Sequence, residues 1–157
     1  MDDIKWVCKH FNELTVHELY ALIKLRNEVF VVEQNCVFQD ADDNDQHCFH
    51  LCGLVGNVLV AYARIVPAGV TYPYNSIGRV ITSPAYRKEG FGKALMTEAI
   101  KQVENLFGKK PIKIGAQLYL KRFYQDFGFR QTGEMYLEDG IPHIEMLLEH
   151  PSNSTVE

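Results

Sequence analysis

One stretch of the sequence constrains the fold more than any other: an apolar strand, a loop of basic residues and glycines, and a long helix follow directly on one another. Residues 77–82 form an apolar run that is stopped by Ser83 and Pro84, as expected of a strand. Residues 90–107 then repeat an apolar side chain at every fourth position and end at Gly108, which is the pattern of an amphipathic helix. A strand that leads through such a loop into a helix favours a sheet covered by helices.

The other predicted elements place this unit within a mixed sheet. Strands are predicted over residues 4–11, 47–55, 57–66, 77–82, 112–115, 129–137 and 141–148, and helices over residues 16–32, 90–107 and 118–127. Thr15 and Glu18 have the spacing of a capping box before the first helix. Gly56-Asn57 and Glu138-Asp139-Gly140 predict hairpins. The fold class is therefore predicted as α/β of the α+β kind, with a central mixed β-sheet flanked by helices.

Length and charge limit the class of protein. The chain has 157 residues, which suits one domain over residues 1–150 followed by a flexible tail over residues 151–157. The net charge is −4, whereas a binder of duplex nucleic acid usually has a basic excess. No stretch reaches the roughly 18 apolar residues of a membrane helix, and the first residues lack a signal peptide. We therefore expect a cytoplasmic protein with reduced cysteines that binds neither nucleic acid nor membrane.

The loop between residues 82 and 93 is suited to bind a phosphate. Gly90 and Gly92 allow close backbone approach, and the start of the following helix offers unpaired N–H groups with a partial positive charge. Arg87, Lys88 and Lys93 add positive charge. The spacing is that of neither a Walker loop nor a dinucleotide fingerprint. A plain tight turn with solvated charges remains the alternative.

The same loop carries a resemblance to a known family. Arg87-Lys88-Glu89-Gly90-Phe91-Gly92 resembles the Arg/Gln-x-x-Gly-x-Gly/Ala pyrophosphate loop of the GNAT superfamily, the acetyl-CoA-dependent N-acyltransferases. Residues 80–87 also resemble the segment before that loop, and residues 123–129 resemble the family's Tyr-x-x-x-Gly-Phe signature. Residues 25–34, 77–80 and 138–146 are similar to the ElaA-like subgroup of the family.

The resemblance implies an enzyme that moves an acetyl group from acetyl-CoA to a primary amine, by direct attack in a ternary complex. The amine would belong to a small molecule, a protein lysine or a protein N-terminus. The residues that would contact acetyl-CoA are Val80, Ile81, Thr82, Arg87, Lys88, Glu89, Gly90, Phe91, Gly92, Lys93, Gln117 and Tyr124. Loop N–H groups would hold the pyrophosphate, and backbone groups of residues 80–82 would hold the pantetheine arm and polarise the thioester carbonyl.

Tyr124 is the candidate general acid. A phenol has a pKa of about 10 and a thiol a pKa of about 8.5, so a tyrosine keeps its proton at neutral pH and can give it to a departing thiolate. Tyr124 also lies on the apolar face of its predicted helix, where a purely structural role is the alternative.

The general base is left open by the sequence. The candidates are Glu33, His50 and His143, with a relay through water as a further alternative. Many relatives carry a glutamate on the strand where this chain has Arg79. We expect Arg79 to bind an acidic group of the substrate, or else a buried carboxylate such as Glu33 or Glu145.

Three features of the sequence allow other functions. A catalytically inactive CoA-binding sensor or interaction module on the same fold is the alternative to an enzyme. Cys36, His47, Cys48, His50 and Cys52 cluster in the sequence, but their spacing fits no common zinc site, so no metal is expected. Residues 40–45 form an acidic loop that either is solvated or attracts a cationic amine. A homodimer is open, and the sequence does not identify the acceptor amine.

Overall fold

An eight-stranded mixed sheet runs through the protein, in the order β1-β2-β3-β4-β5-β8-β6, with β7 also paired to β8. The computed structural model describes residues 3–149, so the predicted tail over residues 151–157 lies outside the described part. The strands are β1 (Lys5–His10), β2 (Phe49–Val55), β3 (Val58–Val66), β4 (Asn75–Thr82), β5 (Ile112–Gln117), β6 (Arg130–Gln131), β7 (Tyr136–Glu138) and β8 (Ile141–Leu148). This mixed sheet with its covering helices confirms the predicted fold class.

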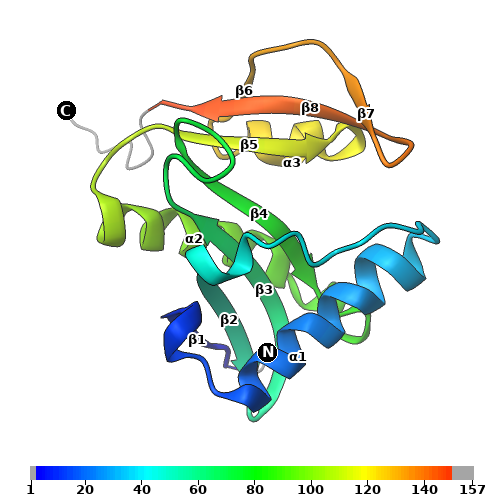
Figure 1. The fold of residues 1–157 in the computed structure, drawn as a ribbon, viewed down its shortest axis with the longest axis vertical. Helices are drawn as coiled ribbons and strands as arrows, with labels where there is room; N and C mark the ends of the chain where they lie inside the picture. Colours follow the sequence, from blue (N-terminus) through cyan, green and yellow to red (C-terminus); the bar gives the residue numbers. More distant parts are fainter. Residues whose placement is uncertain (1–2, 150–157) are drawn as a thin grey trace.

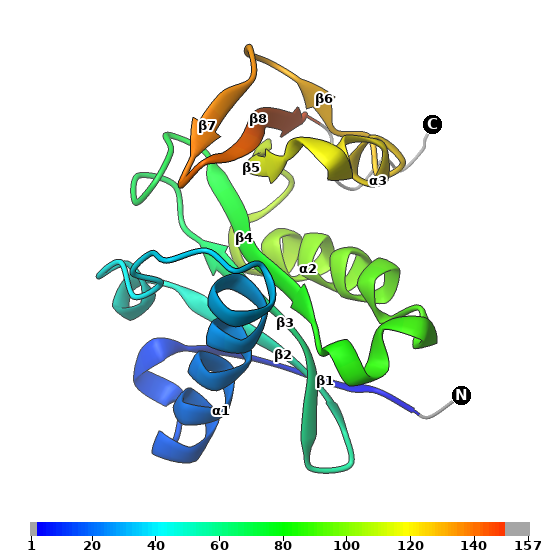
Figure 2. The same cartoon turned by 90° about the vertical axis from the view of Figure 1, so that its right-hand side faces the viewer.

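Helices cover both faces of the sheet (Figure 1 and Figure 2). The longer ones are α1 (Val16–Arg26), which continues into the π-helical turn η2 (Asn27–Glu33), then α2 (Phe91–Phe107) and α3 (Lys121–Gln125). Short 3-10 turns are η1 (Phe11–Glu13), η3 (Asp45–His47), η4 (Pro84–Glu89) and η5 (Leu118–Leu120). The helix α1 packs on one face around Leu22 and Tyr62, whereas α2 packs on the other face around Leu95 and Ala99. The apolar face predicted for residues 90–107, with an apolar side chain at every fourth position, is therefore the one that α2 buries.

Local sequence signals explain where several elements begin and turn. The hydroxyl of Thr15 accepts a hydrogen bond from the Glu18 N–H, and the Glu18 carboxylate accepts one from the Thr15 N–H, which confirms the predicted capping box. The β7–β8 hairpin turns through Asp139 and Gly140, both with positive φ, as the predicted hairpin requires.

Three predicted boundaries are wrong. The strand expected over residues 129–137 is broken between β6 and β7, because residues 132–135 arch out opposite two residues of β8. The strand expected from residue 47 begins at Phe49, since Asp45–His47 form a 3-10 turn. The helix expected over residues 118–127 starts with a 3-10 turn and becomes α-helical only at Lys121.

The feature that positions the site is the divergence of β4 from β5. The two strands are parallel neighbours, but they pair only at Asn75–Ile112 and Ser76–Lys113. Figure 1 shows the consequence: β1 to β4 form one part of the sheet, and β5, β8, β6 and β7 form the other, with a widening gap between their ribbons. Beyond Ser76, the N–H and C=O groups on this side of β4 lack the partner strand that a continuous ladder would supply.

A β-bulge distorts β4 at the same place. The register with β3 shifts between Tyr62 and Arg64, and Arg79 adopts a positive φ of 50°. A bulge increases the local twist and re-aims side chains, and bulges are frequent beside active sites. Here it lies beyond Ser76, the last residue of β4 that pairs with β5.

Among the described residues, none of the helices combines the length with the apolar composition needed to cross a bilayer.

Candidate active site

A cleft of about 590 Å³ opens where β4 and β5 separate. Its volume lies within the range of small-molecule sites, roughly 300–1,000 Å³. Five segments form its walls: η2 with the loop that follows it, the diverging part of β4, η4 through Arg87, the end of β5 with η5 and α3, and the tip of the β7–β8 hairpin. Of the predicted residues, the cleft brings together Glu33, Arg79, Val80, Ile81, Thr82, Arg87, Gln117, Tyr124 and His143.

The glycine loop joins β4 to α2 beside this cleft. Gly90 has a φ of +77°, a left-handed conformation that favours glycine, and it is the N-cap of α2. No side chain caps this helix start, so the N–H groups of its first turn keep no intrahelical partner. A Cβ built on Gly90 or Gly92 meets no atom within 4 Å, which leaves open space at the helix start. The arrangement has the donors, the dipole and the room that a phosphate needs.

Tyr124 lies at the opposite wall of the cleft. Its side chain is 6% exposed, and its ring packs edge-on against Phe123 and Phe129 at centroid distances of 5.1 and 6.0 Å. Burial raises the pKa of Tyr124 to about 12, so the hydroxyl stays protonated at neutral pH. Within residues 3–149 the structure gives that hydroxyl no hydrogen-bond partner, although the residue lines the cleft. It is placed to donate a proton to a bound group.

His143 is a base candidate that the structure places in the cleft. It stands opposite Gln117 in the β5–β8 ladder and stacks on the Tyr136 ring at 5.8 Å. Its Nδ1 lies 2.7 Å from the carbonyl oxygen of Ile141. A carbonyl only accepts, so Nδ1 carries the proton in the neutral ring and Nε2 carries the lone pair. The tautomer therefore suits a base.

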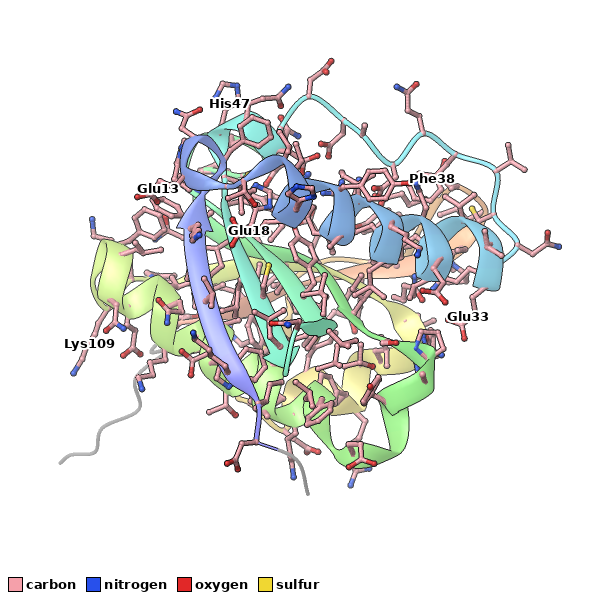
Figure 3. The ribbon with its side chains drawn as sticks, turned by 90° about the horizontal axis from the view of Figure 1, so that it is seen from below. Glu13, Glu18, Glu33, Phe38, His47 and Lys109 are labelled. Atoms are coloured by element: carbon pink, nitrogen blue, oxygen red, sulfur yellow. The ribbon has the colours of Figure 1, made fainter. Side chains whose placement is uncertain are left out.

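Glu33 also lines the cleft, at the end of η2. Its carboxylate accepts two hydrogen bonds from Arg87, which hold the pKa of Glu33 below its ordinary value. Figure 3 shows Glu33 at the end of the first long helix, facing the segment that precedes α2. The helix predicted to run to Val32 is π-helical from Asn27, and π-helical turns are frequent at functional sites.

His50 is not in the cleft, which corrects its prediction as a base. Its side chain is fully buried, with Nδ1 at 2.6 Å from the Tyr62 hydroxyl and Nε2 at 2.9 Å from the Asp45 carbonyl. Burial lowers the pKa of His50. With both ring nitrogens used inside the protein, His50 has none left for a substrate.

Arg79 contacts neither Glu33 nor Glu145. Its Nε donates to the Asp40 carboxylate at 2.9 Å, and its Nη2 donates to the Asp40 carbonyl at 2.9 Å. Glu145 pairs instead with Lys113 at 3.0 Å. The carboxylates that Arg79 holds are therefore Asp40 and, at 3.4 Å, Asp42. An acidic group of the substrate would have to compete with both for Arg79.

The acidic loop over residues 40–45 folds inward onto three arginines. Asp40 and Asp45 accept hydrogen bonds from Arg26, which is fully buried, each at 2.8 Å. Arg64 donates to Asp42 and Asp45 at 2.8 and 2.9 Å. The loop is thus neither simply solvated nor presented to an amine, which corrects both expectations. The sequence signal that could have predicted these ion pairs is an arginine inside each of two apolar elements, Arg26 in α1 and Arg64 in β3. Buried arginines are almost always paired.

These ion pairs predict acid-sensitive stability. Burial opposes the ionisation of Asp45, but the hydrogen bonds from Arg26 and Arg64 outweigh it and hold the pKa of Asp45 below its ordinary value. A lowered folded-state pKa adds stability above the unfolded-state pKa, about 3.9, and this stability is lost as the pH falls below it. We expect urea denaturation to show a falling unfolding free energy below about pH 4.

The matched comparison is Asp45→Asn against Asp126→Asn, since Asp126 is exposed and has no ion pair among the described residues. Asp45→Asn should flatten the acid limb, and Asp126→Asn should leave it unchanged. Equal acid limbs in all three proteins would show that Asp45 is not its source.

No group of three or more His, Cys, Asp or Glu side chains is placed to hold a metal ion within the part of the chain that the structure describes. The four cysteines are all free thiols. Cys48 precedes β2 and donates to the Asn44 carbonyl, while Cys52 packs in the core below α1. These residues do not converge on one point.

Some cleft residues were not predicted from the sequence. They come from the loop after η2 and from the β7–β8 hairpin: Cys36, Phe38, Glu138, Asp139 and Ile141. Phe38 lies under the Arg79 guanidinium at 6.0 Å, and the Cys36 thiol lies 3.6 Å from the Asp139 carbonyl. The ElaA-like resemblance included the hairpin, but only the three-dimensional arrangement shows that the two segments meet across the cleft.

Comparison with known proteins agrees with this geometry. The family model described as an acetyltransferase (GNAT) domain matches residues 26–150. Protein ElaA of Escherichia coli (strain K12) is 46% identical over 148 residues, which cover 93% of this chain and 97% of that protein. Its crystal structure matches with a TM-score of 0.87 at 45% identity, covering 94% of this chain and 100% of the other.

An acyl-CoA N-acyltransferase from Pseudomonas aeruginosa matches with a TM-score of 0.88 at 41% identity, covering 92% of this chain and 99% of the other. A GNAT family acetyltransferase from Elizabethkingia anophelis, solved with acetyl-CoA bound, shares the fold with a TM-score of 0.63 at 17% identity, over 95% and 99% of the two chains. The chain therefore belongs to the GNAT family of acyl-CoA N-acyltransferases, in its ElaA-like subgroup.

Proposed function

We propose that this protein transfers an acetyl group from acetyl-CoA to a primary amine, by direct attack in a ternary complex. Membership of the family and the likeness to an acyl-CoA N-acyltransferase support acyl transfer from a CoA thioester. The observation that carries the proposal is a cleft lined by the unpaired part of β4 and by Tyr124 with its protonated hydroxyl, with the uncapped start of α2 beside it.

The donor would lie along the gap between β4 and β5. The pyrophosphate would accept hydrogen bonds from the N–H groups of residues 88–93, beside Arg87. The pantetheine amides would pair with the backbone of Val80, Ile81 and Thr82, where β5 has moved away. Gln117 at the end of β5 exchanges hydrogen bonds with Gln34 across the cleft, and its amide would meet the donor from the other side.

The chemistry follows from these positions. The neutral amine attacks the thioester carbonyl and forms a tetrahedral intermediate whose oxyanion accepts a hydrogen bond from a β4 N–H group. Collapse of this intermediate forms the amide, breaks the C–S bond, and leaves a thiolate that takes the proton of Tyr124. The amine's own proton passes to His143 Nε2 or to Glu33, directly or through water. Arg79 on β4 cannot serve as this base, because it is a cation held by Asp40.

The amine acceptor would come from the side of the cleft formed by the loop after η2 and the β7–β8 hairpin. Glu138 and Asp139 lie at that side, and neither carboxylate forms an ion pair within residues 3–149. We keep both a small molecule and a protein lysine or N-terminus as acceptors.

The test is release of CoA thiol from acetyl-CoA in the presence of an amine panel of polyamines, amino sugars, amino acids and lysine peptides. Turnover with one class, with the acetylated amine detected by mass spectrometry, is the expected result. Binding of CoA without turnover on any class would favour the alternative, a CoA-binding sensor on the same fold. Longer acyl-CoA thioesters run in parallel establish whether the acetyl group is the preferred one.

Gly90→Asp is expected to weaken CoA binding by at least about tenfold, measured by isothermal titration calorimetry. The new carboxylate would stand beside the helix start, and two like charges about 4 Å apart repel by about 4 kcal/mol near a protein surface. Aspartate tolerates a positive φ, so the fold should be preserved.

The control is Gly56→Asp. Gly56 also has a positive φ and also has open space around its Cβ position, but it lies in the β2–β3 turn away from the cleft. Unchanged CoA affinity is expected there. Equal losses in both variants would mean that the pyrophosphate does not bind at the loop before α2.

We also propose that the protein acts in the cytoplasm, without nucleic-acid or membrane partners. A homodimer is compatible with the cleft, and size-exclusion chromatography with light scattering decides between monomer and dimer.

A further inference from the structure

One ion pair joins two walls of the cleft that are distant in the sequence. Arg87 Nη1 and Nη2 donate to the two carboxylate oxygens of Glu33 at 2.5 and 2.6 Å, over a separation of 54 residues. The two side chains are 40% and 39% exposed, so the pair lies at the mouth of the cleft. Glu33 ends η2, Arg87 lies in η4 just before the glycine loop, and the contact therefore bridges the acceptor side and the donor side.

The Arg87 guanidinium in this pair would also bind a second anion, the donor pyrophosphate. A guanidinium binds a carboxylate and a phosphate with the same fork of two parallel N–H groups. Both Nη atoms of Arg87 are engaged by Glu33, and the remaining contact is a 3.5 Å hydrogen bond to the Thr82 carbonyl. A pyrophosphate seated at the start of α2 would approach Arg87 while Glu33 holds both Nη atoms. Glu33 would also repel it.

The carboxylate in this pair is masked from the rest of the cleft. Both oxygens of Glu33 accept from Arg87, so neither has its best lone pair directed at an incoming ammonium group. Among the described carboxylates that line the cleft, Glu33 is the one with an ion pair to the loop that would hold the donor.

We propose that Glu33 and the donor pyrophosphate compete for Arg87, so that donor binding releases the Glu33 carboxylate to bind the ammonium group of the acceptor. This inference rests on the proposed function. The pair acts as a contact that lowers donor affinity and keeps Glu33 from the acceptor until the donor is bound. Glu33 then has a defined role in the loaded cleft, as the counter-ion of the incoming amine.

The alternative is a structural clamp in which Glu33 positions Arg87 for the pyrophosphate. Competition and a clamp predict opposite changes in CoA affinity for Glu33→Gln. Competition predicts tighter CoA binding, because the pyrophosphate no longer has to displace the Glu33 carboxylate from Arg87. A clamp predicts weaker binding, because Arg87 loses its support.

The experiment is calorimetric titration of CoA into wild type, Glu33→Gln, Arg87→Gln and the double variant, with Glu28→Gln as the control. Glu28 is an exposed carboxylate near Arg87 that makes no hydrogen bond to it. Competition predicts that Glu33→Gln tightens CoA binding about two- to fivefold, the range expected from an exposed ion pair. It also predicts no such gain in the Arg87→Gln background and no change for Glu28→Gln.

A second readout separates the acceptor role. With acetyl-CoA saturating, Glu33→Gln should raise the KM for the amine while the KM for acetyl-CoA falls. Unchanged or weaker CoA binding in Glu33→Gln overturns the proposal. An equal gain in CoA affinity from Glu33→Gln with and without Arg87 also overturns the proposal, because it would indicate simple charge repulsion between Glu33 and the pyrophosphate. Absence of CoA binding to the wild type would instead refute the proposed function, so the two failures are distinguishable.

Discussion

Tyr124→Phe should lower kcat by about 10²–10⁴-fold, the usual contribution of a positioned proton donor. The change removes only the hydroxyl, so the ring contacts with Phe123 and Phe129 and the local packing are retained. Because the thiolate would then leave without a proton from the enzyme, the loss should appear in kcat, while acetyl-CoA affinity stays within about twofold. Steady-state kinetics together with calorimetric titration separate these two quantities.

The pH profile gives an independent check on the same residue. Burial raises the pKa of Tyr124 to about 12, and an acid is competent while it is protonated. Tyr124 should therefore cause no decline in rate on the alkaline side below about pH 10. The matched control is Tyr20→Phe, which removes an exposed hydroxyl on α1 and should leave kcat unchanged. A Tyr124→Phe variant with wild-type kcat would show that the thiolate takes its proton from water.

Arg26→Met is expected to lower the free energy of unfolding by about 3–5 kcal/mol, the usual cost of breaking a buried ion pair by removing one partner. Arg26 is fully buried and donates to both Asp40 and Asp45. Methionine fills much of the same volume, so the loss comes from the two carboxylates that remain buried with fewer donors. Urea denaturation at pH 7 measures it.

The control lies on the same helix. Lys24→Met removes an exposed cation that makes no ion pair within residues 3–149, and it should change stability by less than about 0.5 kcal/mol. Because Asp40 also holds Arg79 on β4, Arg26→Met should additionally reduce kcat/KM for the amine. A cost of less than about 1 kcal/mol would mean that Arg64 and Arg79 alone satisfy the loop.

The parts of the fold that the sequence predicted are those encoded locally. The amphipathic period of α2, the capping box at Thr15 and the turn at Asp139-Gly140 depend on neighbouring residues, and each lies where it was expected. The glycine loop at a helix start was predicted on the same grounds, and the structure adds the positive φ of Gly90 and the absence of a side-chain cap.

The parts that were missed depend on residues far apart in the chain. The β4–β5 pairing ends at Ser76, the bulge follows at Arg79, and Arg79 is held by Asp40, 39 residues away. An apolar periodicity cannot distinguish the π-helical turn η2 from a regular continuation of α1, because both bury Val29. The prediction of His50 as a base was wrong for the same reason. A strand pattern shows on which face of the sheet a side chain lies, but not that the Tyr62 hydroxyl already binds the His50 ring.

The central claim, that a CoA thioester binds between β4 and β5 with its sulfur at Tyr124, is tested most directly by a crystal structure with acetyl-CoA. We expect the pyrophosphate against the N–H groups of residues 88–93 and the pantetheine arm along residues 80–82. We also expect the thioester sulfur within about 3–3.5 Å of the Tyr124 hydroxyl. A donor bound with its pyrophosphate away from the glycine loop, or with its sulfur out of reach of Tyr124, would contradict the account.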